Sequence, residues 1–419
     1  MSTRKLKIND KIQWLVLWCM CLGRYVEPIC IILLLILCRR KYSCPHICFF
    51  LMVLFVHFII ANLITDYPWS KFIQQFTIVS LMTLGYYQFF HNYVPSIQGL
   101  WNKYLKISLW MCYIGYLQYG MFLLLGHDYI GEFVSYQYMT ENTARMQGIF
   151  IEPGNFAAFI TPAVAYCWLN RHEKGMNKKS LYLMTLALLL TFTTIGYFSL
   201  FIIFVYIFRK TILKYCWLTI IPLLMFVTYV INFKTADENA GNNKFDAMLM
   251  KFSNTYNSLS YIKPEHFELL DLSSYAILSN LWVADNAPCR LIGTGLGTHE
   301  VNYKKEYPDT GFHHYGLNST DAYSLFTRIY SEFGYLGIAF LFVWIIKRFN
   351  CKNNINIALA FLLLSLLIRG GHYFQYGVIF FVYCYYYSGK RKLSIASKSK
   401  YDFDKRKTKV DAVIRTKTL

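Results

Sequence analysis

The sequence lacks the residue spacings that commonly hold a metal ion or a nucleotide. It contains no Cys-x-x-Cys pair and no His-Glu-x-x-His motif. The glycine-rich run 293–297 is not followed by Gly-Lys-Ser/Thr, so it does not match a P-loop. It does not lie in a βαβ unit either, as a dinucleotide site would. We therefore predict no bound metal and no cofactor.

Paired cysteines are missing from the polar parts of the chain. Most of the 12 cysteines fall within apolar blocks, and only Cys289 falls within the long polar segment 232–329. One cysteine cannot build a disulfide framework, so that segment must be held together in another way.

Charged residues are few, at 16% of the chain, whereas 56% of the residues are hydrophobic. The sequence does not show the alternating polar faces of a soluble domain. Instead, blocks of about 15 to 25 apolar residues recur from end to end, which is the length needed to cross the hydrocarbon core. The first block has no small-residue cleavage site, so we interpret it as a retained anchor. The sequence thus predicts an all-α, polytopic membrane protein.

Acidic residues are scarcer than basic ones, and the formal net charge is +19 at pH 7. Such a charge can indicate nucleic-acid binding, but here the basic residues gather at both termini and in short connectors. The segment 232–320, by contrast, carries more Asp and Glu than Lys and Arg. This asymmetry follows the positive-inside rule, so we predict cytoplasmic termini and no nucleic-acid partner. The basic connectors are 39–41, 171–179, 209–210 and 347–348.

The apolar blocks predict about twelve membrane crossings, or ten to twelve if the shortest are re-entrant. Two stretches, 12–38 and 181–208, are each long enough for one helix. A single crossing by either would place basic connectors on opposite faces, so we divide both near 23–28 and 193–196. The predicted segments are 10–22, 26–39, 46–64, 72–94, 104–126, 155–170, 181–193, 196–209, 212–231, 330–346, 355–369 and 372–388.

This topology divides the chain into four parts. Residues 1–231 form an N-terminal membrane bundle, and 232–329 form one large extracytoplasmic loop. Residues 330–388 are C-terminal membrane helices, and 389–419 are a basic cytoplasmic tail. Apolar residues at helical spacing predict short amphipathic helices within the loop, lying on or over the bundle. These residues are Phe245, Met248, Leu249 and Phe252.

Arg145 is the most informative residue of the outer segment 127–154. It is the only Lys or Arg between His127 and Glu152, on a face where basic residues are depleted. A guanidinium is a planar, permanently charged fork of donors that matches phosphate oxygens. Pro153 and Asn155 then look like the start of a helix, whose free N–H groups also favour anions. The alternative is a snorkelling arginine, or one paired with a nearby glutamate.

Two further stretches of the long loop contain candidate site residues. Arg290 precedes the glycine-rich run, which is either a tight turn or a means of bringing Arg290 near Arg145 as a second phosphate donor. His313 and His314 are candidates for a general base, because histidine titrates near neutral pH. Asp321 either orients a histidine or acts as the base itself. The alternative for either histidine is a solvated loop residue.

Ionisable residues also occur at the edges of the later membrane segments. Arg328 and Glu332 are four residues apart and either pair on one helix face or serve the site. Charged groups in such places are costly, which favours a functional role. Arg369 and His372, at another outward turn, are weaker candidates.

At this point the sequence resembles a known family. The pattern Arg-x-x-Gly-x-x-x-x-Pro-x-Asn-x-x-Ala, formed by Arg145, Gly148, Pro153, Asn155 and Ala158, resembles a motif of the O-antigen ligase and polymerase superfamily. Further features agree with it. They are the helical break at 194–197, the run Gly293, Gly295 and Gly297 ending a long outer loop, and a following helix with Glu332, Gly334 and Gly337.

The resemblance implies a membrane glycosyltransferase with a GT-C-like bundle in the bacterial inner membrane. It would join glycans carried on undecaprenyl diphosphate at the outer face, without a metal. We favour an O-antigen or exopolysaccharide polymerase, because Ser319, Asp321 and Tyr323 stand where ligases tend to have a His-Asn pair. The resemblance also implies a second arginine early in the loop. Residues 271–280 contain none, so Arg290 is a substitute candidate.

In the mechanism that the resemblance implies, Arg145, with Arg290 or Arg328, stabilises the departing diphosphate. A base takes the proton of the acceptor hydroxyl, and the anomeric centre inverts. The supporting residues are Glu152, Glu332, Gly293 and Gly295. The partners are the lipid-linked donor and acceptor glycans, membrane lipid, a chain-length regulator and a flippase. The alternatives are an O-antigen ligase acting on a lipid A-core acceptor, a flippase or transporter for the same lipids, and a channel or structural subunit.

Overall fold

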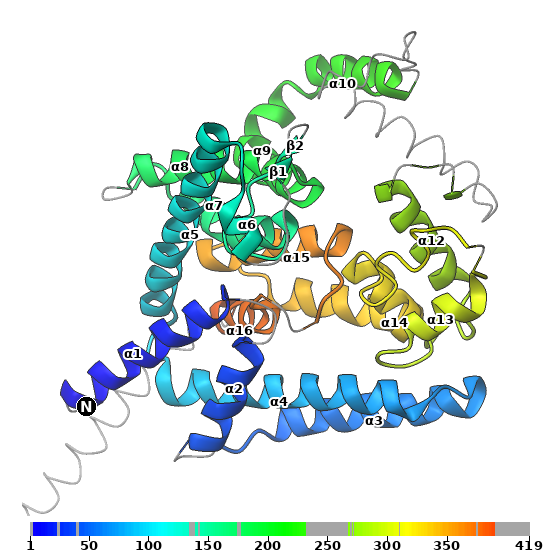
Figure 1. Ribbon diagram of the computed structural model, residues 1–419. Coiled ribbons are helices and arrows are strands. Elements are labelled where there is room, and N and C mark those ends of the chain that lie inside the picture. The colour runs from blue at the N-terminus through cyan, green and yellow to red at the C-terminus, as the bar shows by residue number, and fades with distance from the viewer. Residues whose placement is uncertain are drawn as a thin grey trace, which may run out of the picture.

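We describe the fold from a computed structural model of the chain (Figure 1). The described residues are 3–22, 26–38, 42–133, 139–140, 143–173, 177–231, 267–268, 270, 272–309, 311–373 and 376–389. Within them the protein is helical, apart from two strands of two residues each. The predicted helix at 245–252 and the tail 390–419 lie outside these residues.

The helices before the long loop are α1 (Thr3–Cys19), α2 (Val26–Leu37), α3 (Pro45–Thr65), α4 (Trp69–Tyr93), α5 (Ile97–Leu125), α6 (Tyr129–Phe133), α7 (Pro153–Leu169), α8 (Lys178–Leu190), α9 (Thr194–Lys214) and α10 (Cys216–Ile231). Those that follow are α12 (Leu272–Asn286), α13 (His299–Glu306), α14 (Leu325–Arg348), α15 (Asn354–Ile368) and α16 (Val378–Gly389). The strands β1 (Met139–Thr140) and β2 (Thr143–Ala144) pair antiparallel.

Each of the twelve predicted segments overlaps a helix, and a helix ends at each of the two predicted breaks. α1 ends at Cys19 and α2 begins at Val26. Pro28 lies in the first turn of α2, where its missing N–H would have had no helical partner. α8 ends at Leu190, and the Thr193 side chain caps α9 by accepting a hydrogen bond from the Gly196 N–H at 3.1 Å.

The apolar helices indicate a membrane protein. Four helices, α3, α5, α9 and α14, are long and apolar enough to span a bilayer, and α2, α15 and α16 are shorter apolar helices. Large apolar side chains cover the outside of α3, where Leu63 is 82% exposed. Such a surface suits lipid rather than water. The figure of twelve crossings stays a prediction.

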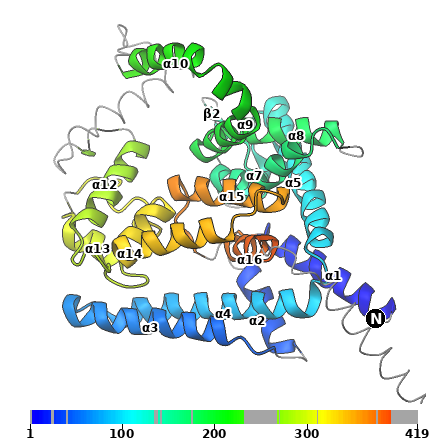
Figure 2. The same ribbon diagram turned by 180° about the vertical axis from the view of Figure 1, so that it is seen from behind.

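Two helices form the centre of the bundle. α7 and α15 pack against each other, and most of their side chains are buried (Figures 1 and 2). Small residues in α7, such as Ala157 and Ala163, allow the two backbones to approach closely. α9 packs against both helices, and a hydrogen bond of 2.7 Å joins Ser199 of α9 to Ser365 of α15. The surrounding helices cover this central pair.

Contacts sort the helix connections into two groups. Connections predicted to be cytoplasmic meet one another: the Asn354 side-chain amide donates to the Asn170 side chain at 2.6 Å, and Lys103 pairs with Asp10 at 2.5 Å. Connections predicted to face outward also meet, since the Gly370 N–H donates to the Tyr323 carbonyl at 3.0 Å. We call these groups the inner end and the outer end, after their predicted sides.

The loop helices α12 and α13 lie beside the first half of α14 (Figures 1 and 2). An aromatic core joins them, in which Tyr275, Tyr303 and Tyr307 are buried. This part of the loop is docked on the α3–α4 hairpin. Tyr67 donates to Asn302, and Lys71 pairs with Glu300 at 2.8 Å. A compact aromatic core therefore holds this part of the loop together.

Candidate functional site

A pocket opens at the outer end, where distant parts of the chain meet. The start of α7 contributes Glu152, the 318–323 turn contributes Asp321, and the turn after α15 contributes Arg369 and His372. Its remaining lining is mostly apolar. These residues are Gly154, Asn155, Ala158, Ile195, Leu362, Leu366, Gly370, Tyr376, Val378 and Phe381. We call this site the outer pocket.

Asp321 and His372 face each other in the outer pocket. His372 Nε2 lies 3.3 Å from Asp321 Oδ2, and the Asp321 side chain is only 10% exposed. Two backbone features bring them together. Ala322 has a φ of 58°, so the chain turns sharply after Asp321. A Cβ on Gly371 would overlap the Asp321 carbonyl, so only glycine allows this approach.

Arg369 and Glu152 place opposite charges on the wall of the outer pocket. The Arg369 guanidinium lies over the Tyr323 ring, 3.9 Å from its centroid. Its Nη1 is buried and finds no hydrogen-bond partner among the described residues. Burial raises the pKa of Glu152, while the charges of Arg369 and Arg145 oppose that rise. Asp321 raises the Glu152 pKa further, which shows that the two carboxyl groups are close in electrostatic terms.

Arg145 lies behind this wall rather than in the lining. Its half-buried side chain donates from Nε to the Thr191 carbonyl at 3.5 Å. The backbone around it is held firmly, because the Met146 N–H donates to the Leu190 carbonyl at 2.9 Å. The Gly148 N–H donates to Gln118 at 2.8 Å, in a left-handed conformation with a φ of 59°. The positive charge of Arg145 still acts on the pocket wall, because it opposes the rise in the pKa of Glu152.

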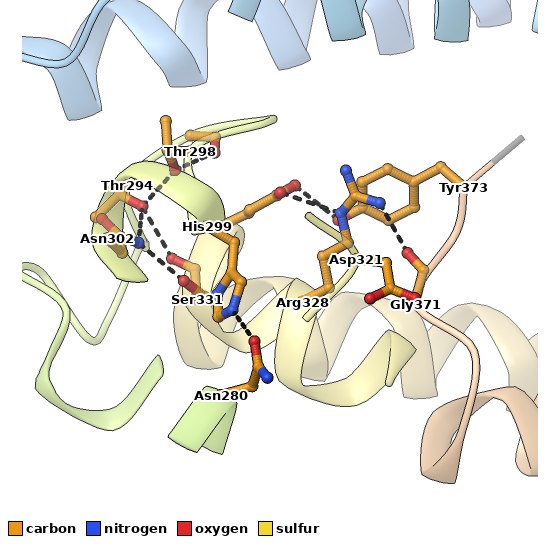
Figure 3. Close-up of polar contacts among 12 residues, drawn as sticks. Asn280, Thr294, Thr298, His299, Asn302, Asp321, Arg328, Ser331, Gly371 and Tyr373 are labelled. Carbon is orange, nitrogen blue, oxygen red and sulfur yellow. Dashed lines mark hydrogen bonds and ion pairs between the residues drawn. The ribbon is translucent and has the colours of Figure 1, made fainter. Parts of the chain in front are cut away.

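Arg328 is buried beside the outer pocket and does not line it. It is 3% exposed and pairs with Glu332 at 3.1 Å, and its Nη1 donates to the Gly371 carbonyl at 2.8 Å (Figure 3). The Tyr373 hydroxyl donates to the other oxygen of Glu332 at 2.8 Å. The Tyr373 ring also lies against the guanidinium, 4.1 Å from the carbon of the charged group. Arg328 is thus engaged with the protein itself.

The glycine-rich run packs against a break in α14. Gly334 has a φ of 62° and interrupts the helix. A Cβ on Gly334 would lie 2.5 Å from the Arg290 carbonyl oxygen, and a Cβ on Gly293 would overlap the Glu332 backbone. Gly295, with a φ of 103°, is packed on Phe58 in the same way. We call the packing of residues 290–293 against residues 332–334 the glycine interlock, and its role is close packing of two backbones.

Arg290 and the two histidines lie away from the outer pocket. Arg290 is 52% exposed and pairs with Asp285 at 3.2 Å. His313 is exposed, and its ring lies 3.7 Å from that of His314, centroid to centroid. None of the three lines the pocket. The structure therefore brings together Glu152 and Asp321, with Arg145 and Arg328 just behind them, and leaves Arg290, His313 and His314 apart.

A second polar group lies next to the glycine interlock and was not foreseen from the sequence. We call it the Asn302 network. Asn302 donates to Thr294 at 2.9 Å and to Ser331 at 2.8 Å (Figure 3). His299 bonds through Nε2 to Asn280 at 2.9 Å. The network comprises Thr294, Thr298, Asn302 and Ser331, and we include in it the adjacent His299–Asn280 pair, which forms its own hydrogen bond.

His299 is fully buried in the Asn302 network, and its charged form is disfavoured. Burial, aided by the positive charge of Arg328, lowers the pKa of His299 to about 3. The ring is therefore neutral at physiological pH. The only sequence signal for these residues was the presence of Asn and His within otherwise ordinary loop helices. That signal does not separate a buried network from a solvated face.

Comparison with known proteins adds no assignment: the chain matches no family profile, no curated protein and no solved structure. The described residues also contain no cluster of three or more His, Cys, Asp or Glu side chains that would hold a metal ion. What the outer pocket offers is a carboxylate–imidazole pair for moving a proton, beside a guanidinium that favours an anion.

Proposed function

We propose that this protein is a polysaccharide polymerase. It transfers a glycan from an undecaprenyl-diphosphate carrier to the hydroxyl of a second lipid-linked repeat, at the outer face of the bacterial inner membrane. The observation that supports this most is the outer pocket itself. It places Arg369 and the Asp321–His372 pair within one apolar-walled site at the outer end of a membrane bundle.

Arg369 would hold the diphosphate of the donor, and the positive charge of Arg145, which acts on Glu152 of the pocket wall, would add to the attraction for an anion. The buried Nη1 of Arg369 supplies a donor in a site of low polarity, where its hydrogen bonds to phosphate are strong. Negative charge grows on the diphosphate as its bond to the anomeric carbon breaks. A positive charge already in place stabilises that transition state more than the ground state. Arg369 therefore takes the part that the resemblance gave to Arg290 or Arg328.

The Asp321–His372 pair would act as the base. The acceptor hydroxyl loses its proton to the pair, and its oxygen forms a bond to the anomeric carbon. The bond from that carbon to the diphosphate breaks, and undecaprenyl diphosphate leaves. Attack from the face opposite the leaving group inverts the anomeric centre. His313 and His314 lie outside the pocket, so we assign them no step.

The apolar lining of the outer pocket suits a carrier that enters from the bilayer. Leu362 and Leu366 of α15 and Phe381 of α16 form part of that wall. A polymerase of this kind would also work beside a flippase that supplies its substrate and a regulator that sets chain length.

The decisive experiment is turnover by the purified protein in nanodiscs with defined lipid-linked repeats. We expect chains of several repeats from the wild type and none from Arg369→Ala. Cells lacking the protein should accumulate single repeats. Complete absence of surface glycan in such cells would instead identify a flippase, and free polymer beside an uncapped lipid core would identify a ligase.

A further inference from the structure

We propose that the buried Arg328–Glu332 pair is a positioning device that holds His372 against Asp321. Its catalytic meaning rests on the proposed function, but the geometry stands by itself. Arg328 would then be neither a ligand for the diphosphate nor a general stabiliser of the bundle. It would set the distance and orientation of the base.

The contacts of this ion pair fall on both neighbours of His372. Arg328 Nη1 donates to the carbonyl of Gly371, and Glu332 accepts from the hydroxyl of Tyr373. Residues 371 and 373 are thus held by hydrogen bonds to two side chains of one helix, α14. With both neighbours held, the direction in which His372 leaves the backbone is fixed as well.

The same segment is fixed against the turn that carries Asp321. The Gly370 N–H donates to the Tyr323 carbonyl at 3.0 Å, and Gly371 packs directly on the Asp321 carbonyl. Asp321 lies a few residues before α14, and Arg328 and Glu332 lie in its first turns. The carboxylate and the ion pair that holds the neighbours of His372 therefore belong to one continuous segment. The 3.3 Å contact between Asp321 and His372 follows from these anchors.

The chemistry of the pair suits positioning better than stability. A buried ion pair rarely adds net stability, because removing two charges from water offsets their attraction. A guanidinium, however, donates in fixed directions from a planar fork. Here Nε donates to Glu332 while Nη1 donates to Gly371, and a lysine ammonium cannot reproduce both directions. Arg328→Lys should therefore keep the charge and lose the geometry.

The test uses full-length protein in nanodiscs, with Arg328→Lys as the main variant and Tyr373→Phe as a gentler one. Arg209→Lys is the matched control, because it makes the same chemical change at an exposed arginine of the inner end. Turnover and donor KM are measured with lipid-linked repeats. The imidazole ¹³C NMR signal of His372 is followed as well, identified by its loss in His372→Gln.

We expect Arg328→Lys to lower kcat by roughly 10- to 100-fold with donor KM unchanged, as for a displaced catalytic group. Tyr373→Phe should lower kcat by about 3- to 10-fold, since it removes only the hydrogen bond from the Tyr373 hydroxyl to Glu332. Both variants should shift the His372 signal, and Arg209→Lys should not.

Other outcomes separate this inference from the proposed function. A raised donor KM in Arg328→Lys with an unmoved His372 signal would show that Arg328 binds the diphosphate, and would overturn the inference. An unmoved signal with unchanged kinetics would overturn it too. If the wild type polymerises nothing and the signal still moves in both variants, the clamp stands and the proposed function fails.

Discussion

Polar side chains gather at two neighbouring places near the outer end, and they are used differently. In the Asn302 network the polar atoms mostly bond to one another, around a neutral, buried His299 (Figure 3). In the outer pocket, Arg369, Glu152, Asp321 and His372 place ionisable side chains along the wall of an opening. The comparison teaches that burial with internal partners marks a structural role. Charge facing an opening marks a place for a ligand.

The largest effect is expected where the Asn302 network meets the glycine interlock. Gly293→Ala forces a Cβ into the Glu332 backbone at a φ of 73°. Strain and overpacking together should cost roughly 3 to 6 kcal/mol, and little folded protein should remain. Gly120→Ala is the control, because a Cβ there meets nothing within 4 Å. Fluorescence-detected size exclusion measures both. Equal recovery of the two variants would mean that the interlock is loose.

Acid should weaken the Asn302 network. The pKa of His299 is about 3 in the fold and about 6.5 when unfolded, so the unfolded chain takes up this proton first as the pH falls. The contribution of His299 to stability is complete above pH 6.5 and is lost progressively down to pH 3. The loss is up to about 5 kcal/mol.

Thermal unfolding between pH 7 and pH 4 measures this acid sensitivity. His299→Gln keeps an N–H donor near the position of Nε2 but cannot titrate, so its stability should vary less with pH than that of the wild type. Parallel pH curves for the two proteins would contradict a buried, neutral His299.

At the outer pocket, substitutions should affect turnover and leave the fold intact. Arg369→Ala and Arg145→Ala should each lower polymer formation by roughly 10²- to 10³-fold, as expected when a preorganised donor is removed from a transition state. Arg145→Lys should rescue poorly, because an ammonium lacks the planar fork. Arg209→Ala at the inner end controls for loss of an arginine. Wild-type chain lengths in either site variant would refute that arginine's role.

A smaller effect, a gain in stability rather than a loss, is expected when Glu152 is replaced. Burial raises its pKa in the fold, so the charged form is a net cost there. Glu152 favours the fold fully only below its ordinary pKa of about 4.5, and that contribution is lost as the pH rises through the folded pKa. Glu152→Gln should therefore melt higher than the wild type at pH 7, with the gap closing toward pH 4.5. A lower melting temperature at pH 7 would show that its arginine neighbours outweigh burial.

The smallest effect concerns metal removal. If arginine stabilises the leaving diphosphate, a chelator should leave the activity of the purified protein unchanged. The measurement is polymer formation before and after treatment with EDTA. Full loss of activity, restored by a divalent cation, would overturn the metal-free mechanism.

The helices were predictable because apolar blocks recur along the chain, although only four of the helices are long and apolar enough to span a bilayer. The breaks near 23–28 and 193–196 were predictable as well, because the positive-inside rule favours basic connectors on one face. Glu152 and Asp321 were named from their surroundings in the chain. The approach of Arg369 and His372 to them was not predictable. It depends on α15 packing along α7, and periodicity says nothing about which helix ends become neighbours.

The residues that the sequence singled out for their type were a less reliable guide. His313 and Arg290 are chemically capable but stand in exposed positions. Asn302 and His299, which attracted no notice, are fully buried. Glycines gave a better signal, since Gly293 and Gly334 both proved to sit where a side chain cannot fit. A glycine-rich pattern in a sequence indicates positions where the backbone needs glycine. A polar residue in a loop, by contrast, can be either buried or exposed.

The interruption of α14 at Gly334 has a consequence for biogenesis. The Tyr335 N–H, released at the break, donates to the Arg290 carbonyl at 3.0 Å, and the Leu336 N–H donates to that of Leu291 at 3.1 Å. A helix entering lipid without those acceptors would carry bare amides into hydrocarbon. Residues 290–291 are synthesised earlier than α14. Their carbonyl groups therefore already exist when the N–H groups of Tyr335 and Leu336 need acceptors. The final packing of α14 therefore requires the backbone of residues 290–291 to be in place beside its break.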